Sequence, residues 1–207
     1  MFKVRIEDLT DLVFGLALSI GAIALINRSE DDISDVLTGL FWFTFSFLIL
    51  ISVWISYSRI ISRLKIESPR LLVLNVALLL LVAIEPYLLN VMAFDVNSQN
   101  YPELLNGAST LYALDLGGIW LIMAGFNQQA FRQGVEGREA FVAARNSRLI
   151  DAAIFLASAL PVFWTLALFD LPVRFLIWYV SIPLGVIGHG YLVRRARERY
   201  GGEDDGA

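Results

Sequence analysis

The sequence predicts an all-α, polytopic membrane protein with six transmembrane helices, and three observations support this fold class. Of the 207 residues, 57% are hydrophobic and only 17% are charged, which is less charge than a soluble domain of this size carries. The charged residues are gathered between long apolar runs instead of being spread along the chain. Allowing for tilt, each run has the length that a helix needs to cross a bilayer core of about 30 Å.

The apolar runs follow one another with polar segments between them, and each is expected to form one span. They are Leu12–Asn27, Val36–Ser58, Leu71–Phe94, Leu104–Phe131, Ala152–Phe169 and Phe175–Val193. Thr10 and Asp11 precede the first run and are suited to cap its first turn. Ionisable side chains interrupt later runs only at Glu85, Asp115 and His189. The charged connection Gly134–Arg148 is compatible with a short helix before the fifth span.

The distribution of basic residues predicts the orientation of the spans. If the N-terminus is cytoplasmic, all of the 16 Lys and Arg residues except Arg28 and Arg174 lie on the inner side. Basic residues favour the cytoplasmic side of membrane proteins, so both termini are expected there. We expect residues 1–200 to form a single transmembrane domain and residues 201–207 to form a disordered tail.

Several classes of function are disfavoured by what the sequence lacks. There are no cysteines and only one histidine, which argues against thiolate chemistry and multi-histidine metal sites. No nucleotide-binding glycine motif and no nucleophile–base pattern occurs, so we expect neither an enzyme nor a bound cofactor. No basic tract with interleaved aromatic residues indicates a nucleic-acid partner. A cleavable signal peptide is disfavoured because Glu7, Asp8 and Asp11 lie where a basic region is required.

The first apolar run has one bulky apolar face and a neighbouring small one. Leu12, Leu16, Ser19 and Ile23 recur at helical spacing, and Gly15, Ser19 and Ala22 form the small strip. Small residues allow helices to approach each other closely in membranes. This pattern fits a pore-lining helix, and it also fits an ordinary buried helix.

Two motifs flank the first two spans. The first reads Arg5-Ile6-Glu7-Asp8-Leu9-Thr10-Asp11, with Gly15-Leu16 and Ser19 after it. The second reads Trp54-Ile55-Ser56-Tyr57-Ser58-Arg59, and Asn75 and Pro86 follow in the third run. Together they resemble potassium channels of the transmembrane-protein-175 type. That family begins helix 1 with Arg-x-x-x-Phe-Ser-Asp, then an Ala-Ile pair and a threonine, and ends helix 2 with a Trp-x-x-His-x-Arg-like signature. The residues of this chain differ from the family's usual ones at Leu9, Thr10, Gly15, Leu16, Ser19 and Tyr57, so the chain resembles a divergent member.

The resemblance implies a homotetramer in the bilayer, with helix 1 of each subunit lining a pore for K⁺ as the permeant ion. By position, Leu16 would form the apolar constriction, with Ser19 as the adjacent hydroxyl layer and Ile23 and Leu12 as further apolar layers. A ring of bulky apolar side chains closes a pore by excluding water, and hydroxyls partly replace an ion's hydration shell. Arg5, Thr10, Asp11, Trp54 and Asn75 would form the structural motif that holds the inner end of helix 1. The single-repeat length suits a multi-pass protein of a prokaryotic inner membrane.

Two other functions remain open at this point. One is a proton-conducting or proton-coupled carrier that uses Asp11, Glu85 and Asp115, with His189 more consistent with an interfacial residue than a sensor. The other is a small membrane enzyme or assembly protein, which the lack of a catalytic constellation disfavours.

Overall fold

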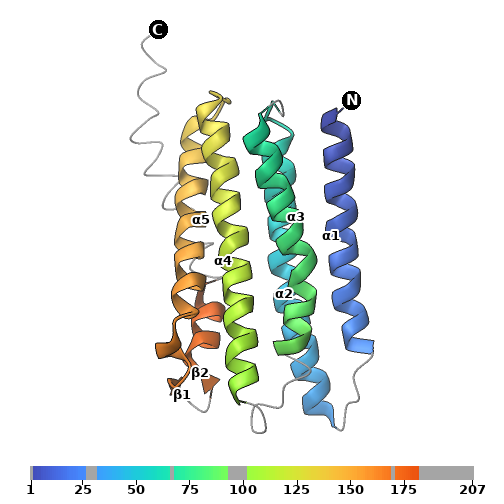
Figure 1. Ribbon diagram of the computed structural model, residues 1–207, viewed down its shortest axis with the longest axis vertical. Coiled ribbons are helices and arrows are strands. Elements are labelled where there is room, and N and C mark those ends of the chain that lie inside the picture. Colours follow the sequence, from blue (N-terminus) through green and yellow to red (C-terminus); the bar gives the residue numbers. More distant parts are fainter. Residues whose placement is uncertain (1, 27–31, 66–67, 93–101, 169–170, 182–207) are drawn as a thin grey trace.

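Five long helices lie side by side and roughly parallel in the computed structural model of the protein (Figure 1). The structure describes residues 2–26, 32–65, 68–92, 102–168 and 171–181. The long helices are α1 (Phe2–Ile26), α2 (Ile33–Ile61), α3 (Pro69–Asn90), α4 (Pro102–Arg132) and α5 (Arg138–Ser158). A 3₁₀ turn (Pro161–Phe163), an antiparallel pair of two-residue strands, β1 (Ala167–Leu168) and β2 (Leu171–Pro172), and a helical segment over 173–181 follow.

Four of these helices, α1 to α4, are long and apolar enough to cross a membrane. They correspond to the first four expected spans, so the protein is a multi-pass membrane protein with mostly helical structure. Most of the expected sixth span, His189 and the tail at 201–207 lie outside the described residues. The count of six spans and the position of the C-terminus therefore stay predictions.

The expected fifth span is wrong in its boundaries. Instead of covering Ala152–Phe169, the helix starts at Arg138 and ends at Ser158. The chain leaves the helix because Pro161 disfavours helical geometry at the residue before it, and Leu160 has the extended angles φ −64° and ψ 140°. Most of the charged connection is therefore part of α5 itself, which begins after Gly137 in a left-handed conformation at φ 84°.

The start of the first helix also differs from the expectation. Because α1 begins at Phe2, Thr10 and Asp11 lie about two turns inside it and cap nothing. Lys3 holds this first part against the end of α2 by donating to the carbonyls of Ser62 at 2.8 Å and Leu64 at 3.2 Å. The first two turns of α1 contain no glycine or proline that would break a helix, so the helix continues back to the first residues.

A side-chain cap defines the beginning of α2. Asp32 accepts hydrogen bonds from the hydroxyl and the backbone N–H of Ser34 and from the backbone N–H of Asp35. The Ser34 hydroxyl, followed by the two backbone donors, lowers the pKa of the Asp32 carboxyl because each donor favours its charged form. These hydrogen bonds therefore fix Asp32 as the residue that caps the start of α2.

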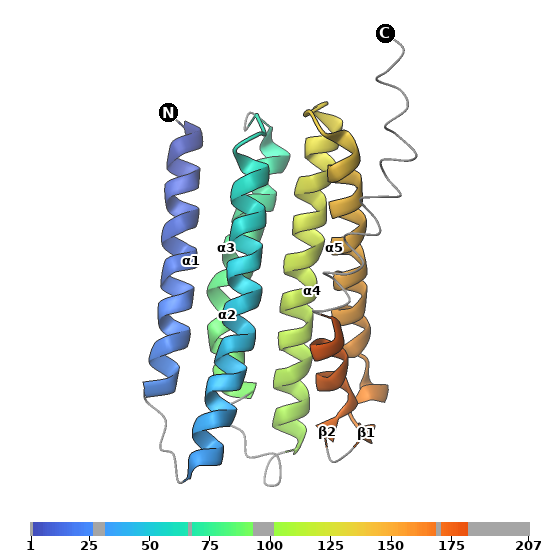
Figure 2. The same cartoon turned by 180° about the vertical axis from the view of Figure 1, so that it is seen from behind.

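The helices are packed unevenly, with α4 in the middle and α1 at one edge (Figures 1 and 2). In the most apolar stretch of α4, 61% of residues are buried, whereas the value for α1 is 22%. Side chains of α4 such as Tyr112, Leu116 and Phe126 have no exposed surface. The first helix packs mainly on α2 and α3, so most of its surface remains available to lipid or to another subunit.

Candidate functional site

The exposed surface of α1 carries a continuous apolar row. Its members are spaced three or four residues apart: Leu9, Leu12, Leu16, Ser19, Ile23 and Ile26. Leu12 is 59% exposed, Leu16 52% and Ile23 52%, although each is large and apolar. Alternating steps of three and four residues keep one face of a helix in register with neighbouring helices along its whole length. This row, called here the α1 seam, contains all four residues predicted to line a pore.

Ser19 is the polar member of the seam. Its Oγ donates to the carbonyl of Gly15 at 2.7 Å, one turn earlier. The hydroxyl proton is therefore directed into the helix, while the oxygen keeps lone pairs on its outer side. An oxygen that presents lone pairs is suited to a cation, and it does not leave an unsatisfied donor in the membrane.

The opposite face of α1 is packed inside the subunit. Ile6, Thr10, Phe14 and Ala17 are buried, and Phe14 and Ala17 belong to the main hydrophobic core. Gly21 lies beside Phe43 of α2, where an added Cβ would meet the ring at 3.5 Å. The orientation of the seam is thus fixed from behind, because rotating α1 would expose this packed face.

A hydrogen bond to α2 fixes the N-terminal half of α1. Trp54 Nε1 donates to Asp11 Oδ1 at 2.8 Å, which joins two residues that the family resemblance assigns to one structural motif. An indole N–H in an apolar environment is satisfied only by finding an acceptor. The pair therefore links the N-terminal half of α1 to the last third of α2.

A second and more deeply buried set of polar contacts lies beside this pair. Thr10 Oγ1 donates to the carbonyl of Ile6 at 2.8 Å and lies 3.3 Å from Tyr57 Oη. Tyr57 Oη in turn donates to Asn75 Oδ1 at 2.6 Å, and its ring packs edge-on to Phe126 at 5.4 Å. These contacts connect α1, α2, α3 and α4 at one level of the bundle. We call Thr10, Asp11, Trp54, Tyr57 and Asn75 the polar anchor of α1.

The contacts around the anchor differ from the sequence-based expectation at Arg5, Lys3 and Tyr57. Arg5 makes no hydrogen bond or ion pair in the part of the chain that the structure describes, so the expected contact with Asp11 is absent there. Lys3, which the motifs do not single out, instead ties α1 to the end of α2. Tyr57 stands out in the sequence only as a departure from the family motif. The signal that identifies it is its position, about one helical turn after Trp54, where a side chain on the same face contacts the same partner helix.

Glu85 and Asp115 lie elsewhere, in the interior of the bundle. Glu85 has no exposed surface, and its Oε1 accepts from Ser46 Oγ at 2.6 Å and from Tyr112 Oη at 2.9 Å. Asp115 follows Tyr112 by about one turn of α4 and is 5% exposed. Asp11 instead binds Trp54, so among the described residues no chain of hydrogen bonds joins all three carboxylates. The described part of the structure provides no continuous set of contacts for the proton-carrier hypothesis.

A comparison with known protein families supports the resemblance that the two sequence motifs indicate. The model of the family described as "Endosomal/lysosomal potassium channel TMEM175" matches residues 5–86, which cover nearly all of α1, the whole of α2 and most of α3. The predicted resemblance to the TMEM175 family is confirmed. No curated protein matches the chain at a significant level.

The likeness to TMEM175 channels extends beyond the matched segment at the level of the fold. A crystal structure described as a lysosomal potassium-selective channel TMEM175 homolog from Chamaesiphon minutus superposes with a TM-score of 0.63. The alignment covers 94% of this chain and 97% of that one at 17% sequence identity. At this identity the likeness shows a shared fold. The family and the structural neighbour are ion channels and not enzymes, which agrees with the expectation for this chain.

Proposed function

We propose that the protein is a potassium-conducting channel whose pore is lined by α1 from four identical subunits. One observation carries the proposal: α1 has a polar anchor behind it and a large, ordered, apolar seam facing away from its own subunit. The match to the TMEM175 family begins on this same helix, and the structural neighbour is described as a potassium-selective channel. Passive flow of monovalent cations through such a pore needs no cofactor.

In this proposal Leu16 forms the constriction. Four leucine side chains meeting on the axis leave an apolar passage that excludes water, which blocks ions until the helices separate. Leu12 and Ile23 form apolar layers on either side, and the Ser19 hydroxyls form the polar layer next to Leu16. The three- and four-residue steps place these layers on one face, as a shared axis requires.

The proposal also includes an orientation. The ends of α2 and α4 that carry Arg59 and Arg132 lie at the same end of the bundle as the start of α1. Under the positive-inside rule this end is cytoplasmic. The anchor then lies toward the inner side of the membrane and the constriction lies nearer its middle.

A flux measurement tests the proposal. Purified protein is placed in liposomes with an outward K⁺ gradient, and flux is compared for the wild type, Leu16→Ala and Leu111→Ala. Leu111 is a matched control because it is a 54% exposed leucine on α4, a helix without extensive contacts to α1. We expect K⁺ flux in the wild type, increased flux with weaker K⁺ over Na⁺ discrimination in Leu16→Ala, and no change in Leu111→Ala.

Two results would contradict the proposal in different ways. If Leu16→Ala and the control behave alike while the wild type conducts, the pore is not closed at Leu16. If no variant conducts under any gradient and cross-linking shows monomers, α1 does not line a shared pore.

A further inference from the structure

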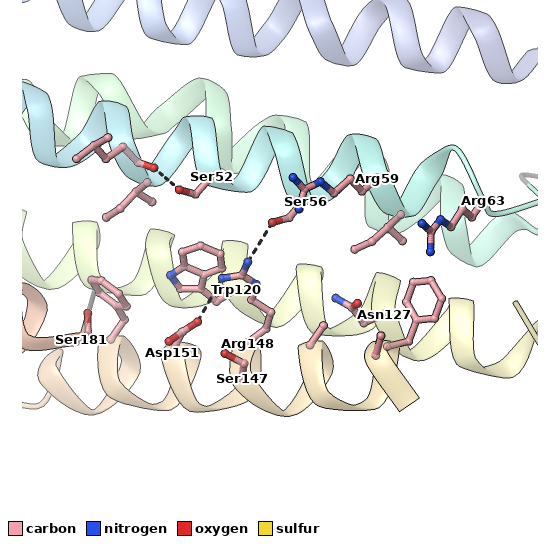
Figure 3. A pocket seen from close by; sticks show the side chains of 17 residues that line it. Ser52, Ser56, Arg59, Arg63, Trp120, Asn127, Ser147, Arg148, Asp151 and Ser181 are labelled. Carbon is pink, nitrogen blue, oxygen red and sulfur yellow. Dashed lines mark hydrogen bonds and ion pairs between the residues drawn. The ribbon is translucent and has the colours of Figure 1, made fainter. Parts of the chain in front are cut away.

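A cavity separate from the α1 seam lies between α2, α4 and α5. Its volume is about 550 Å³, within the range of about 300–1,000 Å³ typical of sites for organic ligands. On α2 the lining residues recur from Leu48 to Ile60, over about three turns of this helix, and Arg63 lines the cavity from the turn that follows α2. Figure 3 shows α2 on one side, with α4 and α5 on the other.

One part of the cavity carries positive charge without a partner. Arg59 lines it from the last turn of α2 and Arg63 from the turn after this helix, and neither side chain makes a hydrogen bond or ion pair among the described residues. Arg148 lines it from α5, but its guanidinium already pairs with Asp151 at 3.4 Å and donates to Ser56 Oγ at 3.0 Å. The charges of Arg148 and Asp151 compensate each other, so Arg59 and Arg63 determine the charge of the cavity.

The side chain of Arg148 forms a rigidly held part of the cavity wall. Its guanidinium lies over the ring of Trp120, 4.4 Å from the centroid. A stacked guanidinium with two further polar contacts is held in one position, unlike a free surface arginine. The hydroxyls of Ser52 and Ser56 lie along the same side of α2. The Ser52 hydroxyl already donates to the carbonyl of Leu48 at 2.6 Å, whereas Ser56 Oγ accepts from Arg148, so of the two only Ser56 keeps a proton for a phosphate oxygen.

The end of the cavity away from Arg59 and Arg63 is mainly apolar, with Ser181 as a polar residue in its lining. Leu48 and Ile49 of α2 and Phe155 of α5 line this part. Because α2 and α4 are membrane-spanning helices, this part is at the depth of the acyl chains, while Arg59 and Arg63 are at the depth of the headgroups. The cavity therefore matches a ligand with an anionic head and an apolar tail.

We propose that this cavity binds an anionic phospholipid. The phosphate lies between Arg59 and Arg63, and one acyl chain follows α2 past Ser52 to Leu48 and Phe155. Basic cavities between membrane helices at the cytoplasmic side have the electrostatic and steric properties that anionic headgroups require. Inorganic phosphate would leave the apolar part of the cavity without a ligand, which is why a lipid is the source of the phosphate here.

Tryptophan quenching measures this binding directly, because Trp120 lines the cavity. The full-length protein is placed in nanodiscs in which dioleoylphosphatidylcholine is replaced stepwise by phosphatidylglycerol with brominated acyl chains. The part of the quenching that is lost in Trp120→Phe reports the cavity. We expect this part to saturate at a low phosphatidylglycerol fraction, and brominated phosphatidylcholine not to reproduce it.

Charge variants test which residues bind the headgroup. In the double variant Arg59→Gln/Arg63→Gln the phosphatidylglycerol fraction at half saturation should rise about thirtyfold, from the loss of two basic contacts. The control Arg70→Gln/Arg132→Gln removes two basic residues from the same end of the bundle that do not line the cavity, and should change nothing. Equal effects of the two variants would overturn the proposal, because they would indicate general attraction to an anionic surface.

A variant that keeps the charges tests the apolar part. Ser52→Phe fills the cavity beside α2 and should abolish the Trp120 quenching, and it replaces the double variant as a test if that protein does not fold. Quenching that persists in Ser52→Phe would overturn the proposal. It would also be overturned if inorganic phosphate competes as well as the lipid, or if neither lipid quenches Trp120.

Discussion

The hydroxyl of Tyr57 offers the sharpest test of how α1 is held in the subunit. Tyr57→Phe removes one oxygen and leaves the ring, so the edge-on contact with Phe126 at 5.4 Å is kept. What is lost is the donor to Asn75 Oδ1 at 2.6 Å and the neighbour of Thr10 Oγ1 at 3.3 Å. Asn75 is only 3% exposed, so water does not replace the missing donor.

The size of the effect follows from these contacts. An unsatisfied buried acceptor costs about 1–3 kcal/mol in water-soluble proteins. Side-chain hydrogen bonds inside membrane proteins contribute about 0.6 kcal/mol on average and up to about 1.7 kcal/mol. Because both partners of this bond are buried, we expect Tyr57→Phe to lower the free energy of unfolding by about 1–2 kcal/mol. This is a factor of about 5–30 in the unfolding equilibrium.

The measurement is reversible unfolding in mixed micelles with increasing sodium dodecyl sulfate, followed by far-ultraviolet circular dichroism. Tyr87→Phe is the control, because Tyr87 is 66% exposed on the same bundle. A double-mutant cycle with Asn75→Leu isolates the pair, and we expect a coupling energy above about 0.5 kcal/mol. Equal stability of Tyr57→Phe and Tyr87→Phe, or additive effects in the cycle, would refute the role of Tyr57 in the anchor.

Two further predictions concern the bundle behind α1. Gly117→Ala should lower the free energy of unfolding by about 1–3 kcal/mol, because the added Cβ would lie 2.7 Å from the Leu156 side chain of α5. The control is Gly107→Ala on the same helix, whose Cβ would meet nothing within 4 Å. It should not destabilise the protein in the same unfolding measurement. Glu85→Gln keeps an acceptor for Tyr112, and its partners lie on α2 and α4, so K⁺ flux in liposomes should be unchanged. Loss of flux in Glu85→Gln would favour the proton-carrier hypothesis over a pore on α1.

The sequence predicts α1 to α4 well because each is a long apolar run, and hydropathy alone decides such elements in a membrane. It fails at α5, where Arg138, Arg145 and Arg148 suggest a connection between spans. In the structure Arg148 is satisfied by Asp151, Ser56 and Trp120, which belong to three different helices. Local composition does not reveal that charges and polar groups far apart in the sequence will compensate one another, so the length of α5 is misjudged.

The α1 seam and the polar anchor also differ in how much of them the sequence predicts. The seam is visible in the sequence as a spacing, and the family resemblance alone assigns Asp11, Trp54 and Asn75 to one motif. The sequence does not identify the hydrogen-bond partner of each anchor residue. The sequence suggests that Asp11 pairs with Arg5, six residues earlier, but the indole of Trp54 is the partner because α1 and α2 are antiparallel neighbours. A pairing across helices depends on their rotation, which the spacing on one helix does not determine.

The position of the anchor along α1 has a mechanical consequence for the proposed pore. At a rise of about 1.5 Å per residue, Leu16 lies about 8 Å from Asp11 along the axis, and Ile23 lies about 18 Å from it. Beyond the anchor, α1 is held by apolar contacts such as those of Phe14 and Ala17. A tilt of α1 about the anchor would therefore move Ile23 more than twice as far as Leu16. Of these two side chains, the one nearer the anchor has the better-defined position, as a constriction that must exclude water requires.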